Sequence, residues 1–586
     1  MIRNLARSLR EYKWPALISP VCMVGEVYME VQIPRVLAKI VDYGVEMGDM
    51  GAVLRYGGIL VVLAIISLMF GVVSAIGASY AATGFARNLR HDMFHKVQTF
   101  DFANIDKFST ASIVTRLTSD VANIQIAFQM MIRMAIRCPM MLILATFQAY
   151  SISPKLCLVY CVVLPLLGLG LYLISRVVFP IFDRVFKTYD KLNNVVQENL
   201  HGIRVVKSFV REAREIDKFS AVSGQIYKDF CKAERTLAFN NPLMQLAVYT
   251  CILVISYLGA TMVVLSGNSA AMGLTTGDLT SMFTYTTQIL SALMMLSMVY
   301  VMLTMTRAPL RRTNEILVEQ PELHNPEVPV TNVPDGSIDF ENVSFRYSKT
   351  AQRNAIEDIN LHIEAGMTVG ILGGTGSSKT TLVQLIPRLY DVTGGVLRVG
   401  GIDVRDYDIQ TLRNSVAMVL QKNVLFSGTI KENLRWGNPN ATDEELEHVC
   451  KLACAHEFIM GFPKGYDHYI EQGGTNVSGG QKQRLCIARA LLKKPKVLIL
   501  DDSTSAVDTA TDASIRAAFA KEIPGTTKII IAQRISSVQS ADRILVLDNG
   551  RIDAFDTHEK LLETNAIYQE IYTSQLEGSG DFDQPA

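Results

Sequence analysis

Charged residues are scarce in this chain, and neither sign of charge predominates. Asp, Glu, Lys and Arg together make up 19% of its 586 residues, the formal net charge is zero, and apolar residues make up 49%. A neutral chain lacks the basic surface that binds nucleic acid, so we expect no nucleic-acid partner. So little charge is unusual for a soluble protein, and at this length it indicates several domains with a membrane-embedded part.

Cysteine pairs with the spacing of metal ligands are also missing. Cys450 and Cys454 are one helical turn apart, which we interpret as helix packing. The nine cysteines are scattered, and five of them lie in apolar runs: Cys22, Cys138, Cys157, Cys161 and Cys251. We therefore expect no cysteine-bound metal.

Long apolar runs fill the first half of the chain. Six of them have about the length that a helix needs to cross a bilayer, at residues 14–40, 57–82, 131–151, 154–178, 243–266 and 279–305. The connections at 41–52 and 267–278 are short and have no Lys or Arg, whereas those at 83–130 and 179–242 are long and basic. By the positive-inside rule, both termini and both long connections are cytoplasmic. This asymmetry makes a soluble bundle of six core helices the weaker alternative.

The N-terminal segment MIRNLARSLREYKW carries arginines at helical spacing. No small-residue cleavage site follows it, so we predict a cytoplasmic amphipathic helix over residues 1–12 rather than a transit or signal segment. The transmembrane domain is predicted at 13–318, with two long cytoplasmic loops, and a proline-punctuated linker at 319–335.

Four ionisable residues lie within the apolar runs. Glu26 and Glu30 are one helical turn apart in the first run, and Arg133 and Arg137 have the same spacing in the third. Ionisable groups at such depth are costly and often functional. They either line a substrate path or cavity, or they pair structurally or extend toward the membrane interface.

A second domain begins near residue 336, where short β-branched strands and amphipathic helices replace the long apolar runs. The segment MTVGILGGTGSSKTTLVQLI has the strand, glycine-rich loop and helix of a P-loop. In such a loop backbone N–H groups cradle phosphates, Lys379 meets the β and γ oxygens, and Thr380 ligates Mg²⁺. The predicted nucleotide-binding residues are Gly373, Gly374, Thr375, Gly376, Ser377, Ser378, Lys379, Thr380 and Thr381.

One residue departs from the P-loop pattern G-x-x-x-x-G-K-[ST]. The last glycine of the pattern is replaced by Ser378. Serine costs little at this position if its φ is negative. We therefore expect nucleotide binding to survive the replacement.

Further segments supply the other parts of a nucleotide site. Tyr347 offers a ring for stacking on adenine, and Gln421 follows a strand as a contact for metal and water. The run VLILDD ends a buried strand in Asp501 and Asp502. A second helix N-terminus ready for an anion begins with Ser478, Gly479, Gly480 and Gln481.

Five motifs in this order resemble the ABC transporter ATPase: the P-loop at 373–381, Gln421, the signature VSGGQ at 477–481, the strand at 497–501, and SAVD at 505–508, which ends in Asp508. With six spans ahead of them, nearly the whole chain resembles a half-transporter of the ABC exporter type. The segment FDFANIDKFSTASIVTRLTSDV resembles the family's first cytoplasmic loop, whose coupling helix transmits motion.

This resemblance implies a multi-domain fold. An all-α domain of six transmembrane helices is followed by an α/β P-loop nucleotide-binding domain at 336–575, and an acidic tail at 576–586 is expected to be disordered. The implied cofactors are ATP and Mg²⁺. The implied assembly is a dimer, with each ATP held between one chain's P-loop and the other chain's signature.

Two residues depart from the family pattern for hydrolysis. Asp501 is placed to hold Mg²⁺, but Asp502 replaces the glutamate that orients the attacking water, and Gln533 replaces the switch histidine. The missing methylene withdraws the carboxylate by more than about 1 Å, and a misplacement of that size costs on the order of 10²-fold in rate. The signature is close to standard, with Val477 in place of leucine.

These departures favour a heterodimeric exporter in the cell membrane that moves amphiphilic compounds such as drugs, lipids or peptides. The partner is then a second half-transporter that carries the glutamate and the histidine, and this chain's signature completes the partner's site. The alternatives are a slow homodimer, an importer with an exporter-type fold, an ATP-gated channel or regulator, and a scaffold without a working ATP site. We see no N-terminal peptidase segment for leader peptides and no added ligand-binding domain of the kind that would favour uptake.

Overall fold

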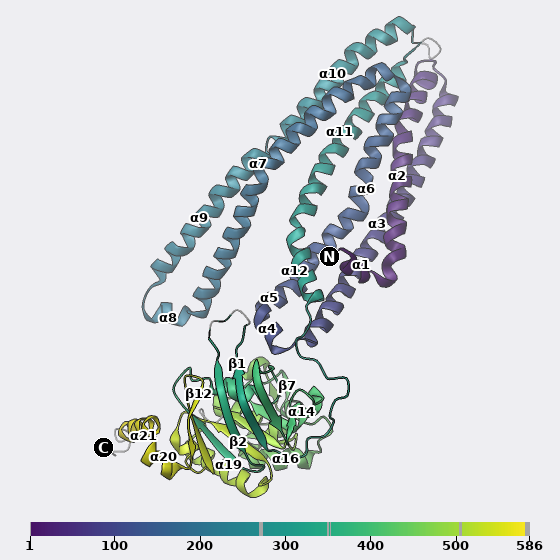
Figure 1. Cartoon of the computed structure of the whole chain (residues 1–586). Coiled ribbons are helices and arrows are strands. Elements are labelled where there is room, and N and C mark those ends of the chain that lie inside the picture. The colour runs from purple at the N-terminus through teal and green to yellow at the C-terminus, as the bar shows by residue number, and fades with distance from the viewer. Residues whose placement is uncertain (1, 269–272, 349–350, 352, 503–506, 580–586) are drawn as a thin grey trace. The chain divides into compact units, whose positions relative to one another are not determined.

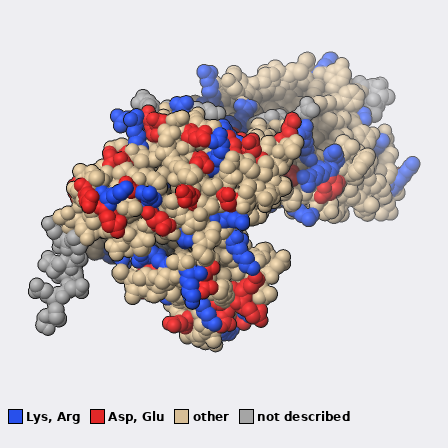
Figure 2. Space-filling view, turned by 60° about the horizontal axis from the view of Figure 1, so that its bottom comes forward, with Lys and Arg blue, Asp and Glu red and all other residues tan. Residues whose placement is uncertain are grey.

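The computed structural model describes residues 2–268, 273–348, 351, 353–502 and 507–579. The chain divides into two compact units (Figure 1). We name the first, residues 1–98 and 109–319, the helical unit, and the second, residues 99–108 and 320–586, the sheet unit. On the face drawn in Figure 2, Lys and Arg are interspersed with Asp and Glu, in keeping with the zero formal net charge.

Six stretches in the described part of the helical unit are long and apolar enough to cross a membrane, which confirms the predicted number of spans. The helices α3 and α7 have 49 and 48 residues, about twice the length that a bilayer requires. They therefore extend beyond the membrane into the basic connections. The main helices are α2 (Lys13–Lys39), α3 (Met50–Gln98), α6 (Val121–Ile152), α7 (Pro154–His201), α10 (Asn240–Ser266) and α11 (Thr276–Met305).

Short elements extend or join these helices. Ser153 separates α6 from α7, and its hydroxyl accepts a hydrogen bond from the Leu156 N–H at 3.4 Å. Pro154 fits the first turn of α7, where no N–H donor is needed. The other elements of the helical unit are α1 (Ile2–Arg7), η1 (Arg10–Tyr12), η2 (Ile40–Val45), α5 (Thr110–Thr115), η3 (Arg116–Asp120), α8 (Ile203–Ser208), α9 (Glu212–Leu237) and α12 (Arg307–Val318).

The core of the helical unit lies where α2, α6, α7, α10 and α11 pack together. Figure 1 shows α2, α6 and α11 side by side, and α7 beside α9. Buried hydroxyl groups find partners across this core: Tyr285 donates to the Val31 carbonyl at 2.7 Å, and the hydroxyls of Tyr160 and Thr286 are 2.7 Å apart. Because a buried hydroxyl without a partner is costly, these bonds help to fix how the helices align.

The sheet unit contains a six-stranded sheet of order β12-β11-β3-β10-β9-β6 and a four-stranded sheet of order β2-β1-β4-β5. The six-stranded sheet is parallel except for β12, whereas the four-stranded sheet is antiparallel. The strands are β1 (Ile338–Phe345), β2 (Ile356–Ile363), β3 (Thr368–Leu372), β4 (Gly394–Val399), β5 (Ile402–Asp403), β6 (Val416–Val419), β7 (Gly428–Thr429), β8 (Tyr469–Ile470), β9 (Val497–Asp501), β10 (Thr527–Ile531), β11 (Arg543–Asp548) and β12 (Arg551–Asp556).

Helices enclose the six-stranded sheet, and β9 is buried along its whole length because both of its faces are covered. These helices are α13 (Lys379–Leu385), α14 (Ile409–Ser415), α15 (Ile430–Leu434), α16 (Asp443–Leu452), α17 (His456–Met460), α18 (Gly479–Leu491), α19 (Thr509–Glu522), α20 (His558–Thr564) and α21 (Ala566–Ser579), with η4 (Gly465–Asp467), η5 (Gln472–Gly474) and η6 (Ile535–Ser537). The alternation of strands and helices is the α/β fold predicted from the sequence, which is confirmed together with the six helices before it.

Four neighbouring parallel strands, β3, β10, β9 and β6, end at one edge of this sheet. The P-loop follows β3, Asp501 ends β9, Gln533 lies just beyond β10, and Gln421 just beyond β6. Ligands of parallel α/β sheets bind at the carboxyl ends of the strands. The topology therefore gathers residues from four distant parts of the sequence at one edge.

Candidate nucleotide site

The loop between β3 and α13 needs glycine at two of its positions. Gly373 has a φ of +151°, and a Cβ atom there would lie 2.1 Å from the Leu547 carbonyl oxygen. Gly376 has a φ of +86°, in the left-handed region that other residues rarely adopt. The predicted phosphate-binding residues Gly374, Thr375 and Gly376 are exposed, whereas Ser377 is buried. A phosphate group has access to the N–H groups of this exposed turn.

Ser378 also adopts the left-handed conformation, with φ 70° and ψ 24°. The sequence-based premise of a negative φ at this position was wrong. The chain turns here into the first residue of α13, in a backbone conformation that glycine adopts more readily than serine. A serine in this region costs about 1 kcal/mol, which the surrounding loop and α13 must offset.

Lys379, the first residue of α13, turns its side chain back over the loop. Its ammonium group donates to the carbonyl oxygens of Gly373 and Gly374, both at 2.8 Å. Burial lowers the pKa of Lys379, while the nearby carboxylates of Asp501 and Asp502 raise it. A cation held among acceptors at the mouth of the loop is well placed to exchange them for phosphate oxygens.

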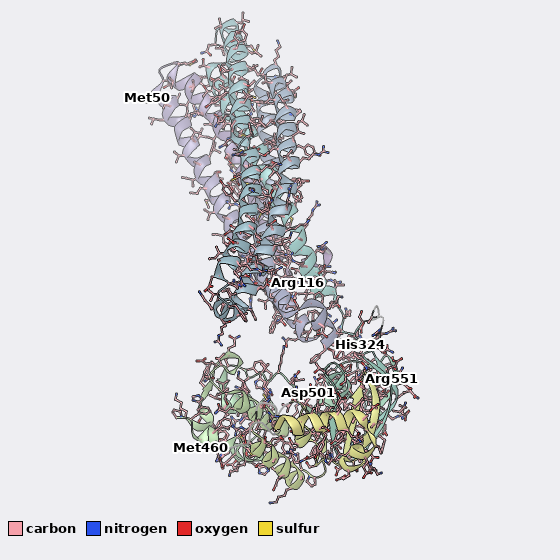
Figure 3. All side chains as sticks on the ribbon, turned by 90° about the vertical axis from the view of Figure 1, so that its left-hand side faces the viewer. Met50, Arg116, His324, Met460, Asp501 and Arg551 are labelled. Carbon is pink, nitrogen blue, oxygen red and sulfur yellow. The ribbon has the colours of Figure 1, made fainter. Side chains whose placement is uncertain are left out.

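Asp501 has a buried carboxylate oxygen that fits a ligand of a cation. Its Oδ1 atom accepts a hydrogen bond from the Thr380 hydroxyl at 3.1 Å, whereas Oδ2 is buried and has no hydrogen-bond partner among the described residues. Burial raises the pKa of this carboxyl group. A hydroxyl and a carboxylate with a vacant buried oxygen fit the oxygen ligands that Mg²⁺ prefers. Figure 3 marks Asp501 in the sheet unit.

Asp502 and Gln533, the two departures from the family pattern, are hydrogen-bonded to each other. The Asp502 Oδ2 atom accepts from Gln533 Nε2 at 2.8 Å and from Gln421 Nε2 at 3.4 Å. Asp502 has a φ of 48°, a conformation that aspartate tolerates better than most residues. Two amides thus share one of the two carboxylate oxygens of Asp502, Oδ2.

The C-terminal helix α21 holds the backbone around Gln533, which the sequence did not reveal. The Gln575 amide donates to the Gln533 carbonyl oxygen at 2.7 Å and accepts from the Ile535 N–H at 2.9 Å. These two bonds fix the segment that follows β10 from both sides. Gln575 could not be identified from the sequence, because a single glutamine on an amphipathic helix belongs to no recognisable motif.

Tyr347, the predicted adenine-stacking residue, belongs to a cluster of aromatic rings. Its hydroxyl lies 2.9 Å from the Thr381 hydroxyl, and its half-exposed ring packs edge-on against Phe345 and Tyr390. The Tyr390 hydroxyl in turn donates to Asp106 at 2.8 Å. Burial and the bond to Asp106 raise the pKa of Tyr390. No sequence motif pointed to Tyr390 or Asp106, because the two residues are 284 positions apart along the chain.

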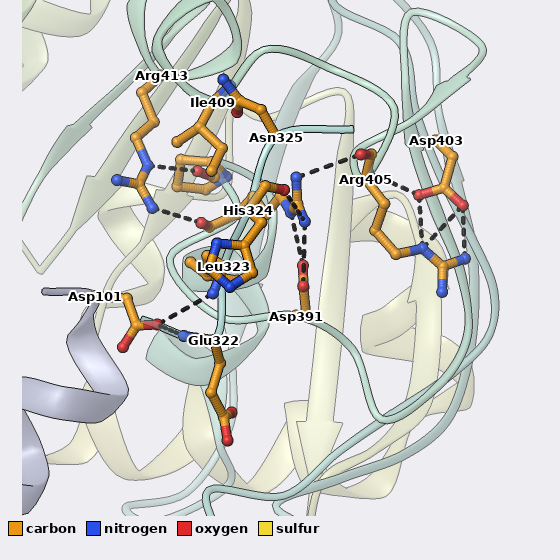
Figure 4. A network of polar contacts seen from close by, with 12 residues as sticks. Asp101, Glu322, Leu323, His324, Asn325, Asp391, Asp403, Arg405, Ile409 and Arg413 are labelled. Carbon is orange, nitrogen blue, oxygen red and sulfur yellow. Dashed lines mark hydrogen bonds and ion pairs between the residues drawn. The ribbon is translucent and has the colours of Figure 1, made fainter. Parts of the chain in front are cut away.

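Asp106 lies on α4 (Phe102–Phe108), which belongs to the sheet unit although it lies between α3 and α5 in the sequence. Figure 4 shows how its neighbour Asp101 is held: the carboxylate accepts from the backbone N–H groups of Glu322 and Leu323 at 2.6 and 3.2 Å. The segment that resembles a coupling helix is thus tied to the linker and to the ring beside Tyr347.

The signature segment begins α18 with a capping box. The Ser478 hydroxyl accepts from the Gln481 N–H at 3.3 Å, and the Gln481 side chain accepts from the Ser478 N–H at 2.9 Å. Ser478 and Gly479 are exposed and Gly480 is half-buried. Val477 is buried in the core, so its side chain supports the segment from below. The remaining N–H groups of the first turn therefore face solvent, ready for an anion.

The motif SAVD lies only partly in the described structure. Ser505 and Ala506 are outside the described residues. Asp508 is the N-cap of α19 and accepts from the Thr511 N–H at 2.9 Å. This bond, with the Thr511 hydroxyl, lowers the pKa of Asp508.

The four ionisable residues of the apolar runs belong to the helical unit. Glu26 and Glu30 on α2 both bind Arg137 on α6, the second through a 2.7 Å contact. Arg133, one turn before Arg137, makes no hydrogen bond or ion pair within the described chain. Structural pairing thus accounts for three of the four residues.

Comparisons with known proteins agree with this architecture. A family model described as "ABC transporter transmembrane region" matches residues 16–294, and one described as "ABC transporter" matches residues 356–505. The chain is 34% identical to the uncharacterized ABC transporter ATP-binding protein YfiB of Bacillus subtilis, over 98% of each chain. It is also 34% identical to the uncharacterized ABC transporter ATP-binding protein YknU of the same bacterium, over 83% of this chain and 82% of the relative.

Among solved structures, a bacterial Atm1-family ABC exporter with ATP bound matches with a TM-score of 0.80. The match covers 97% of this chain and 98% of that one, at 24% sequence identity. This likeness establishes the exporter-type fold, in which six membrane helices precede the ATPase in one chain.

Proposed function

Because this chain belongs to the ABC transporter family, as a membrane unit fused to a cytoplasmic ATPase unit, we propose that it is one half of a heterodimeric exporter. Its own ATP site holds nucleotide and hydrolyses it slowly. Its signature completes a fast site on a second half-transporter, which carries the glutamate and the histidine. The transported compounds are amphiphilic, since they enter and leave through membrane helices.

The observation that carries this proposal is the hydrogen bond between Asp502 and Gln533. Both replaced residues act on the same step, and each occupies the other's polar group at 2.8 Å. A neutral amide cannot carry a proton as histidine does. The short carboxylate and the amide thus remove the base and its helper together, whereas a single drifted residue would leave one of them in place.

Binding groups, in contrast, are retained around the same site. Lys379 and the loop backbone offer donors for phosphate, and Thr380 and Asp501 offer oxygens to Mg²⁺. When bound, the metal neutralises charge on the β and γ phosphates. The chain's own groups therefore support nucleotide binding better than they support hydrolysis.

The exposed signature is the other half of the proposal. In the dimer implied by the family, it faces the nucleotide of the opposite chain. A slow homodimer would pair it with a site that lacks the base, so an intact signature would serve little purpose there. In a heterodimer, the intact signature completes a site that has both the base and the histidine.

Steady-state ATP hydrolysis by the chain alone in lipid, beside the pair co-expressed with its partner, tests the proposal. We expect a nearly inactive lone chain and a fast pair. Within the pair, Gly479→Asp on this chain should lower turnover by about 10²-fold, because its carboxylate would take the helix N-terminus in place of the partner's phosphate and so withdraw that stabilisation from the developing charge. A carboxylate suits a helix N-terminus, so the fold should tolerate it.

The matched variant is Lys379→Ala on this chain, which should lower turnover in the pair by a much smaller factor. A slow homodimer predicts equal losses from the two variants. A scaffold without a working ATP site predicts that Lys379→Ala changes nothing, including ATP binding. Brisk hydrolysis by the lone chain would refute the slow site itself.

A further inference from the structure

A hollow of about 550 Å³ opens among α2, α3 and α6 of the helical unit. Glu26, Glu30, Arg133 and Arg137 line it from α2 and α6. The opposite wall is formed by α3. Its lining residues there include four small ones at helical spacing, which leave space for the hollow: Ala64, Ser67, Gly71 and Ala75. Its volume lies within the range of about 300–1,000 Å³ typical of small-ligand sites.

The hollow lies deep in the membrane. Glu26 is near the middle of the first predicted span, 14–40, and Gly71 is near the middle of the second, 57–82. The sequence places Arg133 near the start of the third apolar run, 131–151, but in the structure it faces these mid-span residues. An arginine at such depth is costly unless something compensates its charge.

Two groups in this hollow have unused bonding capacity. Arg137 bridges Glu26 and Glu30, yet the Glu26 Oε2 atom is buried and accepts no hydrogen bond. The Arg133 Nε atom is buried in the same way, and no group in the described part of the chain pairs with its guanidinium. With respect to the described residues, the hollow thus contains one free cation and one free acceptor, while its four charges sum to zero.

We propose that this hollow binds the headgroup of a zwitterionic lipid, with the phosphate on Arg133 and a primary ammonium group on Glu26. A purely anionic headgroup would leave Glu26 Oε2 without a partner, and a purely cationic one would leave Arg133 without one. A primary ammonium group has three N–H donors, whereas a quaternary one has none. The chemistry therefore selects phosphoethanolamine over phosphocholine and phosphoglycerol headgroups.

This site is independent of the nucleotide site and of the heterodimer. That the bound lipid is also a transported compound rests on the proposed function, and it is tested separately. The lipid tails would lie against the apolar faces of α2 and α3, where Ile33, Leu68 and Val72 line the same hollow.

The test is a binding titration of the full-length chain, stripped of lipid in detergent and followed by native mass spectrometry. Phosphatidylethanolamine, phosphatidylcholine and phosphatidylglycerol with the same acyl chains serve as probes. We expect phosphatidylethanolamine to bind about tenfold more tightly than the other two, the difference that one charge-assisted hydrogen bond makes. Arg133→Gln should weaken both phosphatidylethanolamine and phosphatidylglycerol about tenfold.

Two further variants test the ammonium position at Glu26 independently of the phosphate position at Arg133. Glu26→Gln should reduce phosphatidylethanolamine to the affinity of phosphatidylglycerol. Gly71→Ala changes no charge, but its methyl group would lie 3.2 Å from Glu26 Oε2 and occupy the ammonium position. It should weaken phosphatidylethanolamine alone. Arg176→Gln, at an exposed arginine of α7 outside the hollow, is the matched control and should change nothing.

The proposed site would be refuted if the three lipids bound with equal affinity and Arg133→Gln left those affinities unchanged. Equal binding of phosphatidylethanolamine and phosphatidylglycerol, both weakened by Arg133→Gln, would overturn the ammonium half of it. Thermal unfolding of each variant shows whether a loss comes from misfolding, and Gly71→Ala keeps the test valid if a charge variant fails to fold. Lipid-stimulated ATP hydrolysis by the pair then reports on transport: if binding is selective but hydrolysis does not respond, the substrate assignment is refuted while the site stands.

Discussion

Restoring the two family residues should restore hydrolysis to the lone chain. We expect Asp502→Glu combined with Gln533→His to raise ATP turnover by about 10²-fold, the factor that a misplacement of about 1 Å costs. The longer carboxylate regains its reach toward the attacking water, and the imidazole replaces the amide that now binds Asp502 Oδ2 at 2.8 Å. Phosphate release at saturating Mg²⁺ and ATP, by the chain purified alone in lipid, measures the effect.

The hydrogen bond between these two side chains also predicts that their effects are not additive. Asp502→Glu alone leaves the Gln533 amide competing with water for the carboxylate, and Gln533→His alone leaves the carboxylate too short. The double variant should therefore exceed the product of the single gains by about fivefold, a coupling of about 1 kcal/mol for residues in direct contact.

A matched control and one complication complete this test. Asp542→Glu makes the same chemical change at the opposite edge of the sheet, where the carboxylate accepts a hydrogen bond from the Thr368 N–H at the start of β3, and should leave turnover unchanged. Because Asp502 has a φ of 48°, glutamate there costs somewhat more backbone strain, so thermal unfolding of each variant must accompany the rates. A double variant that binds ATP and remains folded, yet hydrolyses it as slowly as the natural chain, would refute the assignment of slow turnover to this pair.

Three further predictions concern binding and docking. Ser378→Gly should stabilise the chain by up to about 1 kcal/mol, since it relieves a left-handed serine, and Ser378→Thr should destabilise it; thermal unfolding compares the two. Tyr390→Phe should leave ATP affinity unchanged but speed amide hydrogen exchange in α4 by about fivefold, because one hydrogen bond to Asp106 of about 1 kcal/mol is lost; unchanged exchange would contradict the docking described. Burial raises the pKa of Asp501, and Mg²⁺ binds the ionised carboxylate, so the gain in ATP affinity due to Mg²⁺ should begin to decline, as pH falls, at a pH above the usual aspartate range. Affinity measured in EDTA should lack this decline.

The parts of the fold that were predicted correctly from the sequence are those that local sequence patterns determine. A membrane helix is recognised by the length of one apolar run, and the P-loop by neighbours such as Gly373 and Lys379, so no distant contact is needed. The order of parallel strands then follows from a small set of rules for α/β folds. The gathering of Asp501, Gln421 and Gln533 at one sheet edge was predictable for the same reason.

Distant contacts account for what the sequence missed. The φ of Ser378 depends on how the loop meets α13, and the depth of Arg133 depends on how α6 packs against α2 and α3. The bonds of Asp106 to Tyr390 and of Gln575 to Gln533 join residues with no common motif. Spacing along a chain says nothing about such pairs, which arise only when the whole unit is assembled.

A site that binds ATP but rarely hydrolyses it has a physical use in a pair of unequal sites. Nucleotide binding stabilises the closed arrangement by its difference in affinity for the closed and open states, and hydrolysis removes that contribution. Here the groups for binding, Lys379 and Asp501, are retained, while Asp502 and Gln533 are tied to each other. We infer that ATP in this site favours closure through several cycles of the partner's site. In the proposed heterodimer, opening is then controlled by hydrolysis at the partner's site alone, so that one fast site per transporter is enough.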